Sequence, residues 1–382
     1  MVTWGEQANL GTPWTAAVVG GGPAGCSAAY ALARRGVNVV LIERGTAGRD
    51  KACGDMFVPS AAQGLMRMGL DERDLLEAGG VSFDEVDLLG ARGLLWKVRY
   101  HKEPVWILPR RSIDQKLRDK LSAVVDIIYE CAVTALIDES QERSPSSLSR
   151  GVNWRLVGRS SSDNSQEAVR LGTNARVCPQ GISLRCKAVV IASGAQCRLA
   201  RRWGLGGNPV IMPALSAYVR NPGLCAPAFE FVNDCRPGYR WLFPAPKSVA
   251  NIGICALGPA KGSTLKTRGT TLLERCALGD IGRWRAAAAA LWSGLGRRWH
   301  HPAGIVACGD AAGLIDPLNG EGLTAALLSG EAAGSAVANF LLHKQEPKWL
   351  EAYSTWVQQT FSDSYAPSPG RIAWRHLCGL PA

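Results

Sequence analysis

The stretch Ala16–Gly25 reads Ala-Ala-Val-Val-Gly-Gly-Gly-Pro-Ala-Gly. Its apolar first half predicts a buried strand, and the composition of Cys26–Arg35 predicts a helix. Between them, Gly20, Gly22 and Gly25 have the spacing G-x-G-x-x-G. In the context of a strand and a following helix, this spacing predicts a turn that binds a dinucleotide.

Each residue of this turn has a separate physical role. Gly20 permits the tight turn from strand to helix, and a side chain at Gly22 would keep the backbone away from a pyrophosphate. Gly25 allows the helix to pack closely on the strand. Pro23 and Ala24 stand in the first helical turn, whose free N–H groups and positive dipole end favour a pyrophosphate.

An acidic residue follows the second predicted strand. Val37–Ile42 is a short apolar run, and Glu43 stands at its end. A carboxylate at this place accepts hydrogen bonds from a ribose diol, which favours an adenosine with a free 2′-hydroxyl. We include the neighbouring Arg44 among the candidate cofactor-binding residues.

Length and charge restrict the class of protein. A chain of 382 residues exceeds the usual size of one domain, so we expect two interleaved lobes. The net charge is +11, and the arginines are spread along the chain rather than gathered in a tail. Such a charge suits an anionic substrate, a phosphorylated cofactor or an acidic membrane surface, or serves solubility alone. We expect no nucleic-acid partner.

The twelve cysteines include no C-x-x-C pair, and we recognise no signal peptide before Ala16. Reduced thiols and a cytoplasmic location are therefore expected. No run reaches the ~20 uninterrupted apolar residues that cross a bilayer, which leaves a peripheral membrane contact open. We interpret His300 and His301 as a surface turn without metal-ligand spacing, and we expect no metal.

Several segments indicate how the remainder is organised. Gly45–Gly64 is rich in small and polar residues and predicts a long loop. Leu215–Val219, Phe229–Val232 and Val249–Ala256 alternate in polarity like strands of an antiparallel sheet, which predicts a second lobe. Leu272–Leu295 is predicted to be helical.

A second nucleotide motif lies near the other end of the chain. Gly304–Gly313 is an apolar strand running into Gly309 and Asp310, whose carboxylate can hold a polyol. Asp316–Leu323 is a loop that leads into a helix, and the helix dipole suits the negative charge at the N1 and C2=O edge of a reduced flavin. The candidate cofactor-binding residues here are Asp310, Pro317, Gly320, Gly322 and Leu323.

Two such motifs fit one extended FAD, with its adenosine half at the first and its flavin half at the second. The expected fold is α/β: a Rossmann-like FAD-binding domain interleaved with an antiparallel-sheet substrate domain, followed by a C-terminal helical part. We assign residues 1–80, part of 105–215 and 300–345 to the first domain, 81–104 and 216–299 to the second, and 346–382 to the helical segment.

Five segments together resemble the geranylgeranyl reductase family, within the p-hydroxybenzoate-hydroxylase-like flavoproteins. They are Gly20–Gly25 with Glu43; Lys51–Asp55, similar to the flavin loop K-x-C-G-D; Arg110–Leu117, similar to R-x-x-F-D-x-x-L; Pro237–Pro244 with Asn251–Gly253, similar to Y-x-W-x-F-P; and Gly309–Gly322. Two positions depart from the pattern: Met56 replaces the glycine after C-G-D, and Ser193 stands where the superfamily often has aspartate.

The resemblance implies roles for residues in these segments. Lys51, Cys53, Gly54, Asp55 and Arg110 would contribute to the cofactor site. Alternation along a strand places Tyr239, Trp241 and Phe243 on one side, where they wall an apolar substrate channel or form plain core. We name Cys53, Tyr239 and Trp241 as candidate catalytic residues, because a protonated thiol at Cys53 can touch the flavin or donate a proton, although a buried cysteine can also be inert.

Two reactions remain open for reduced FAD, with NAD(P)H or another reductant as electron donor. The first is hydride transfer to a C=C bond of a prenyl-type or other apolar small molecule. The second is a single-component monooxygenase reaction on an aromatic natural product or a peptide tryptophan, so a peptide or protein substrate stays open. A halogenase is less favoured because no W-x-W-x-I-P segment occurs. An FAD-bound interaction protein without turnover is the third class.

Overall fold

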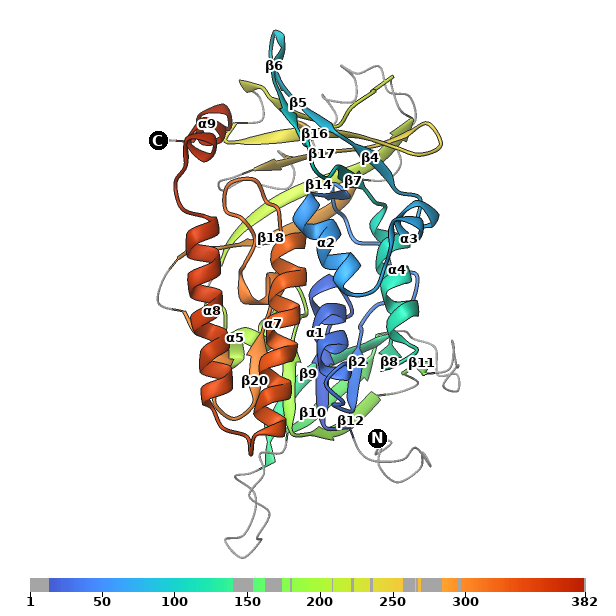
Figure 1. Cartoon of the computed structure of the whole chain (residues 1–382), viewed down its shortest axis with the longest axis vertical. Coiled ribbons are helices and arrows are strands. Elements are labelled where there is room, and N and C mark those ends of the chain that lie inside the picture. Colours follow the sequence, from blue (N-terminus) through green and yellow to red (C-terminus); the bar gives the residue numbers. More distant parts are fainter. Residues whose placement is uncertain are drawn as a thin grey trace, which may run out of the picture.

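The computed structural model describes residues 14–139, 154–161, 174–178, 181–207, 209–220, 223–233, 236–256, 265, 267–268, 284–294 and 297–380. Two seven-stranded sheets dominate this part of the chain. Figure 1 shows them toward opposite ends of the long axis, with long helices beside the first sheet. The expected mixed α/β fold with a C-terminal helical part is confirmed.

The first sheet has the strand order β11-β8-β2-β1-β13-β20-β19, and its pairs are parallel except β19 with β20. Every residue of β1, β2 and β13 is buried, as expected of a parallel sheet covered on both faces. The strands are β1 (Ala16–Val19), β2 (Val39–Ile42), β8 (Asp126–Tyr129), β11 (Ala175–Val177), β13 (Ala188–Ile191), β19 (His300–His301) and β20 (Ile305–Ala307).

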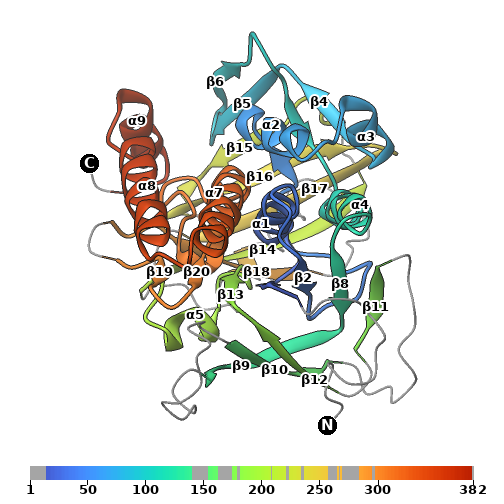
Figure 2. The same cartoon turned by 60° about the horizontal axis from the view of Figure 1, so that its bottom comes forward.

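Helices lie along one face of this sheet, and a small antiparallel sheet lies beyond the other (Figure 2). The helices are α1 (Pro23–Ala33), α4 (Arg110–Leu121), α7 (Leu323–Leu342) and α8 (Lys348–Ser364). The small sheet consists of β9 (Cys131–Asp138), β10 (Trp154–Ser160) and β12 (Gly181–Cys186), with the short helix α5 (Arg198–Arg202) nearby.

Helices α1 and α7 approach each other through small residues. A Cβ atom added at Gly330 would lie 2.3 Å from the carbonyl oxygen of Ala24, and one at Gly334 would lie 2.3 Å from that of Ala28. By length and composition, α7 is the one helix of the described chain that could cross a membrane, and 61% of its most apolar window is buried. Its close packing on α1 accounts for its apolar composition.

The second sheet has the order β18-β14-β17-β16-β15-β5-β6 and is antiparallel apart from the pair β15 and β5. The predicted antiparallel sheet is therefore confirmed. Its strands are β5 (Glu85–Gly90), β6 (Gly93–Arg99), β14 (Val210–Arg220), β15 (Ala228–Phe231), β16 (Gly238–Ala245), β17 (Val249–Ala256) and β18 (Arg285–Leu291).

The remaining elements lie between or beside the two large sheets. Strands β3 (Met56–Phe57), β7 (Val105–Ile107) and β4 (Val81–Phe83) form a small sheet in that order. The other helices are α2 (Pro59–Arg67), α3 (Glu72–Glu77), the 3-10 helix η3 (Gly309–Ala312) and α9 (Pro369–Leu377) near the chain end.

The prediction of one long loop over Gly45–Gly64 is wrong for its second half. The chain forms β3 and then α2. Pro59 stands at the first position of this helix, where its missing N–H costs nothing, and Ala61 and Leu65 form the buried face. Small residues there indicate close packing rather than a loop.

Two further predictions need correction. Residues 272–283 of the predicted helix Leu272–Leu295 lie outside the described residues, while Arg285–Leu291 is a strand because it pairs with β14. Tertiary pairing thus overrides the helix propensity of its alanines. His300 and His301 form the half-buried strand β19 rather than a surface turn, and the His300 ring nitrogen Nδ1 lies 2.7 Å from the Ser354 hydroxyl.

Candidate functional site

The turn between β1 and α1 has the shape that a dinucleotide phosphate needs. Gly20 has φ +111°, and a Cβ atom at Gly25 would lie 1.7 Å from the Gly20 carbonyl oxygen, so both positions require glycine. At Gly22 the nearest atom to such a Cβ is the flexible end of Arg49, at 3.3 Å. No side chain caps α1, whose first position is Pro23. Backbone N–H groups of the first turn, that of Ala24 among them, therefore fit a pyrophosphate.

Glu43 lies at the end of β2 and is buried. Its carboxylate accepts hydrogen bonds from the N–H groups of Gly21 and Gly45, both at 2.7 Å, and lies 3.4 Å from Arg49 Nε. The predicted ribose-binding carboxylate thus also fixes the turn beside it. The neighbouring Arg44 is exposed.

Arg118 of α4 is a part of this region that the sequence interpretation missed. Its buried guanidinium donates to the carbonyl oxygens of Gly21 at 3.1 Å and Ala47 at 2.7 Å. It thereby ties the glycine-rich turn to the loop after β2. A signal was present, because Arg110, Asp114 and Arg118 follow one another at helical spacing on a single face.

The second motif contacts the first directly. A Cβ atom at Gly309, where φ is +58°, would lie 2.8 Å from the Cβ of Ala24 in the first turn of α1. The Gly309 N–H donates to the Ser329 hydroxyl at 2.9 Å. Next to it, the Asp310 carboxylate pairs with Lys51 Nζ at 3.1 Å. Segments from opposite ends of the chain therefore meet at one place, as the sequence predicts for a single extended cofactor.

The loop Lys51–Asp55 lies against the aromatic residues of β16. A Cβ atom at Gly54 would lie 3.0 Å from the Phe243 ring and 3.2 Å from Trp241 Nε1. Asn251 of β17 donates to the Cys53 carbonyl oxygen at 2.8 Å and accepts a hydrogen bond from Trp241 Nε1 at 3.0 Å. One asparagine therefore joins the predicted flavin loop to the aromatic strand.

Asp55 is buried and points toward the second sheet. Its carboxylate accepts hydrogen bonds from Asn251 Nδ2 at 2.7 Å, from the Tyr218 hydroxyl, and from the Arg110 N–H at 3.3 Å. Burial raises the pKa of Asp55 to about 6, although these hydrogen bonds act in the opposite direction. The structure shows this predicted cofactor-binding residue holding its own loop in place.

Arg110 is buried beside the Cys53 thiol. Its Nε and Nη2 atoms each donate to the Asp114 carboxylate at 2.8 Å, in a bidentate pair. Burial alone would lower the pKa of Arg110, but the Asp114 carboxylate raises it well above its usual value. A permanent cation thus lies next to the candidate catalytic cysteine.

The aromatic residues of β16 project from one face, as predicted. Tyr239, Trp241 and Phe243 are all buried. The Tyr239 hydroxyl donates to the Asn319 carbonyl oxygen in the loop before α7, and burial raises the pKa of this tyrosine well above its usual value. Tyr239 therefore stays protonated and ties the aromatic strand to the second nucleotide motif.

Trp374 of α9 extends this aromatic group and escaped the sequence analysis. Its ring centroid lies 5.1 Å from that of Phe229, 5.0 Å from Phe231 and 5.8 Å from Tyr239. Arg371, on the same helix, donates to both carboxylate oxygens of Asp316 at 2.6 and 2.9 Å. Helix α9 is thereby fixed to the aromatic residues and to the loop before α7.

The loop before α7 contains Gly320 with φ +68°, and Gly322 and Leu323 begin the helix after a half-buried Pro317. The Glu321 carboxylate accepts the Thr324 N–H at 2.8 Å. Burial raises the pKa of Glu321 to about 7. The Glu321 side chain thus binds one of the free N–H groups at the start of α7, the helix end that the sequence predicts to face a flavin. The glycine pattern of this loop gave no indication of this role.

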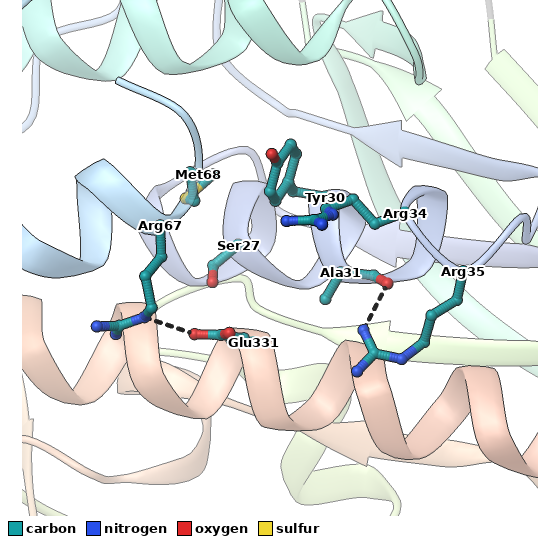
Figure 3. Close-up of a pocket in the computed structure, with 8 residues that line it drawn as sticks. All are labelled: Ser27, Tyr30, Ala31, Arg34, Arg35, Arg67, Met68 and Glu331. Carbon is teal, nitrogen blue, oxygen red and sulfur yellow. Dashed lines mark hydrogen bonds and ion pairs between the residues drawn. The ribbon is translucent and has the colours of Figure 1, made fainter. Parts of the chain in front are cut away.

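A hollow of about 460 Å³ lies elsewhere, between α1, α2 and α7 (Figure 3). Arg67 pairs there with Glu331 at 3.0 Å, and Arg35 donates to the Ala31 carbonyl oxygen at 3.1 Å. None of the predicted site residues is among those that line it. We therefore assign it no part in the candidate site.

Comparisons with known proteins agree with this geometry. A family model described as FAD dependent oxidoreductase matches residues 15–123. The chain is 28% identical to a menaquinone reductase of Mycolicibacterium smegmatis, covering 91% of this chain and 81% of that protein. It is 26% identical to digeranylgeranylglycerophospholipid reductase 1 of Methanopyrus kandleri, covering 91% and 87% respectively.

Solved structures share the fold at low sequence identity. A geranylgeranyl bacteriochlorophyll reductase-like protein of Thermoplasma acidophilum superposes with a TM-score of 0.78 at 20% identity, over 96% of this chain and 88% of the other. p-Nitrophenol 4-monooxygenase of Pseudomonas putida gives 0.70 at 16% identity, over 97% and 94%. The fold is thus common to reductases and monooxygenases and does not separate them.

The fold, the two joined nucleotide motifs and the matching family model define an FAD-dependent oxidoreductase, and this chain is one. Its relatives by sequence include digeranylgeranylglycerophospholipid reductases. The resemblance to the geranylgeranyl reductase family is therefore confirmed.

Proposed function

We propose that this oxidoreductase reduces C=C bonds of a prenyl-type apolar substrate. The observation that carries the proposal is the contact of the Lys51–Asp55 loop with Trp241 and Phe243. A loop that resembles a flavin loop thus lies directly on an apolar aromatic surface. Relatives named as menaquinone reductase and digeranylgeranylglycerophospholipid reductase support this substrate class.

In this proposal the described residues hold FAD at two places. The first turn of α1, with Glu43, would bind the pyrophosphate and ribose, while Asp310 and the loop through Gly322 would bind the polyol and flavin portions. Lys51 pairs with Asp310 in the structure. When FAD binds, Lys51 would either leave Asp310 or contact Asp310 and the cofactor together. When bound, FAD supplies the hydride, which it receives from NAD(P)H or another reductant.

In this proposal the protein orients the substrate, excludes water from the site and donates a proton. Tyr239, Trp241 and Phe243 would position an apolar chain and exclude water, because their side chains line one buried face of β16. We assign proton donation to Cys53, whose thiol neighbours the Arg110 guanidinium. Tyr239 is a positioning residue in this scheme, because its hydroxyl is bound to Asn319.

The domain boundaries and the cellular location complete the proposal. We retain the division into an FAD-binding domain, a substrate domain containing 81–104 and 216–299, and a C-terminal helical segment. The cysteines of the described chain are free thiols, which supports a reducing cytoplasm as the location.

Anaerobic reoxidation of the flavin tests the reaction. The holoenzyme is reduced without oxygen and mixed with a polyprenyl quinone or a polyprenyl lipid, while flavin absorbance is followed. Reoxidation without oxygen, together with a product that has gained two hydrogens, is the expected result. A requirement for oxygen and a hydroxylated product would instead support the monooxygenase alternative. A flavin that no tested substrate reoxidises, with or without oxygen, would favour an interaction protein.

A further inference from the structure

The tip of the β5–β6 hairpin exposes large apolar side chains. Leu94, Leu95 and Trp96 are consecutive on β6 and have exposed fractions of 55%, 49% and 69%. Neighbouring residues of a strand point to opposite faces, so both faces of this strand are apolar and open to water. β6 is the edge of the second sheet and projects at the end of the molecule in Figure 1. An exposed apolar edge of this kind marks an interaction surface.

Charged residues of both signs lie along this hairpin. Arg92 stands in the turn of the hairpin, and Lys102 follows β6; both are exposed. Lys97 and Arg99 lie on the strand itself and pair with Glu85, each at 2.8 Å. Arg92 is thus the basic residue at the tip itself, and an aromatic and aliphatic tip beside a cation is typical of a segment at the interface of an anionic membrane.

An apolar row connects this tip with the aromatic residues of the site. Trp96 pairs with Leu88, Leu88 with Phe229, and Phe229 with Trp241. Side chains of directly opposed residues lie on the same face of a sheet. One face therefore carries large apolar side chains without interruption from the exposed edge to Trp241.

We propose that the β5–β6 tip docks on an anionic lipid membrane through Leu94, Leu95 and Trp96. This surface lies outside the candidate catalytic residues, and docking would turn the apolar row behind it toward the lipid. The overall charge of +11 supports an anionic lipid surface as the occupant, rather than a second copy of this equally cationic chain.

Vesicle sedimentation tests the docking. The holoenzyme is mixed with vesicles of phosphatidylcholine alone or with added phosphatidylglycerol, and the bound fraction is measured after centrifugation. We expect binding to the anionic vesicles. The combined substitution Leu94→Ser, Leu95→Ser and Trp96→Ser should weaken it at least tenfold. Leu76→Ser is the matched control, because Leu76 of α3 is 56% exposed away from the hairpin.

Flavin absorbance and circular dichroism check that each variant is folded. Should the triple variant not fold, Arg92→Glu serves instead, and it should weaken binding to anionic vesicles severalfold. The proposal is overturned when the wild-type protein does not sediment with the anionic vesicles, or when the hairpin variants bind them as tightly as wild type does. It is also overturned when the wild type is a dimer and the hairpin variants are monomers, because the tip would then be an interface between two copies of this chain. Vesicle binding without any reduction of a polyprenyl lipid would leave the docking intact and refute the proposed function.

Discussion

At the scale of single residues, the proposed proton transfer depends on Cys53, which is half-buried beside Arg110. Replacing Cys53 by Ala should leave FAD bound and lower turnover at least tenfold, because a positioned general acid contributes roughly 10²–10⁴ in rate. Rates and flavin content are measured together. Cys225→Ala, at an exposed cysteine, is the control and should change neither. Unchanged turnover of the Cys53 variant would remove this residue from the catalytic list.

Asp55 gives a prediction about pH. Its pKa is raised from 3.8 to about 6 in the folded protein, so the folded state binds the proton more tightly than the unfolded state. The resulting stability is present below pH 4 and is lost as the pH rises through 6, to a total of up to about 3 kcal/mol. Asp55→Asn removes this dependence. The measurement is the free energy of unfolding in urea from pH 4 to 8.

Glu321 has a raised pKa as well and adds a slope of the same sign. Because it is present in both proteins, the difference between wild type and the Asp55 variant isolates Asp55. Parallel curves for the two proteins would contradict the assignment.

At the scale of elements, the close approach of α1 and α7 predicts an asymmetry between two glycines. Gly334→Ala should destabilise by about 1–3 kcal/mol, because its Cβ atom would lie 2.3 Å from the Ala28 carbonyl oxygen. Gly370→Ala in α9 is the control: it meets nothing within 4 Å and should be neutral or stabilising by up to ~1 kcal/mol. Thermal unfolding of both variants decides, and equal effects would mean that the helices are not packed this closely.

The ion pair between α9 and the loop before α7 predicts a second effect. Arg371→Ala should cost about 1–3 kcal/mol and expose α9 to protease, because it leaves the buried Asp316 carboxylate without its bidentate partner. Arg371→Lys keeps the positive charge but cannot donate to both carboxylate oxygens in the bidentate geometry of arginine, so it should show an intermediate rate of cleavage. Cleavage at the wild-type rate in the alanine variant would show that aromatic packing of Trp374 alone holds the helix.

The elements also show what the sequence could reveal. Gly20, Gly25 and Glu43 are required by the geometry of one short strand-turn-helix segment, so the first nucleotide motif could be predicted from residue spacing alone. The pairing of Arg285–Leu291 with β14 could not be predicted from the sequence. An alanine-rich run has no strand pattern, and its partner strand is far away in the chain. Trp374 and Arg371 were missed for the same reason: their contacts join segments with no shared local pattern.

At the scale of the whole molecule, segments from the two ends of the chain meet where we propose that one cofactor binds. Gly309 contacts Ala24, Lys51 pairs with Asp310, and Tyr239 binds the loop at Asn319. The alternation of Tyr239, Trp241 and Phe243 predicted their shared face, whereas their contact with Gly54 depends on how both lobes close. The separate motifs of the site could therefore be predicted from the sequence, whereas the contacts between them depend on tertiary packing.

Titration of FAD with the apoprotein, followed by flavin fluorescence, tests this claim most directly. Wild type should bind one FAD per chain. Gly22→Val, which places a side chain against the pyrophosphate, and Asp310→Ala, at the other end of the chain, should each weaken binding at least tenfold while circular dichroism stays unchanged. Wild-type affinity in a folded Asp310 variant would contradict the account, because the second motif would then lie outside the cofactor site.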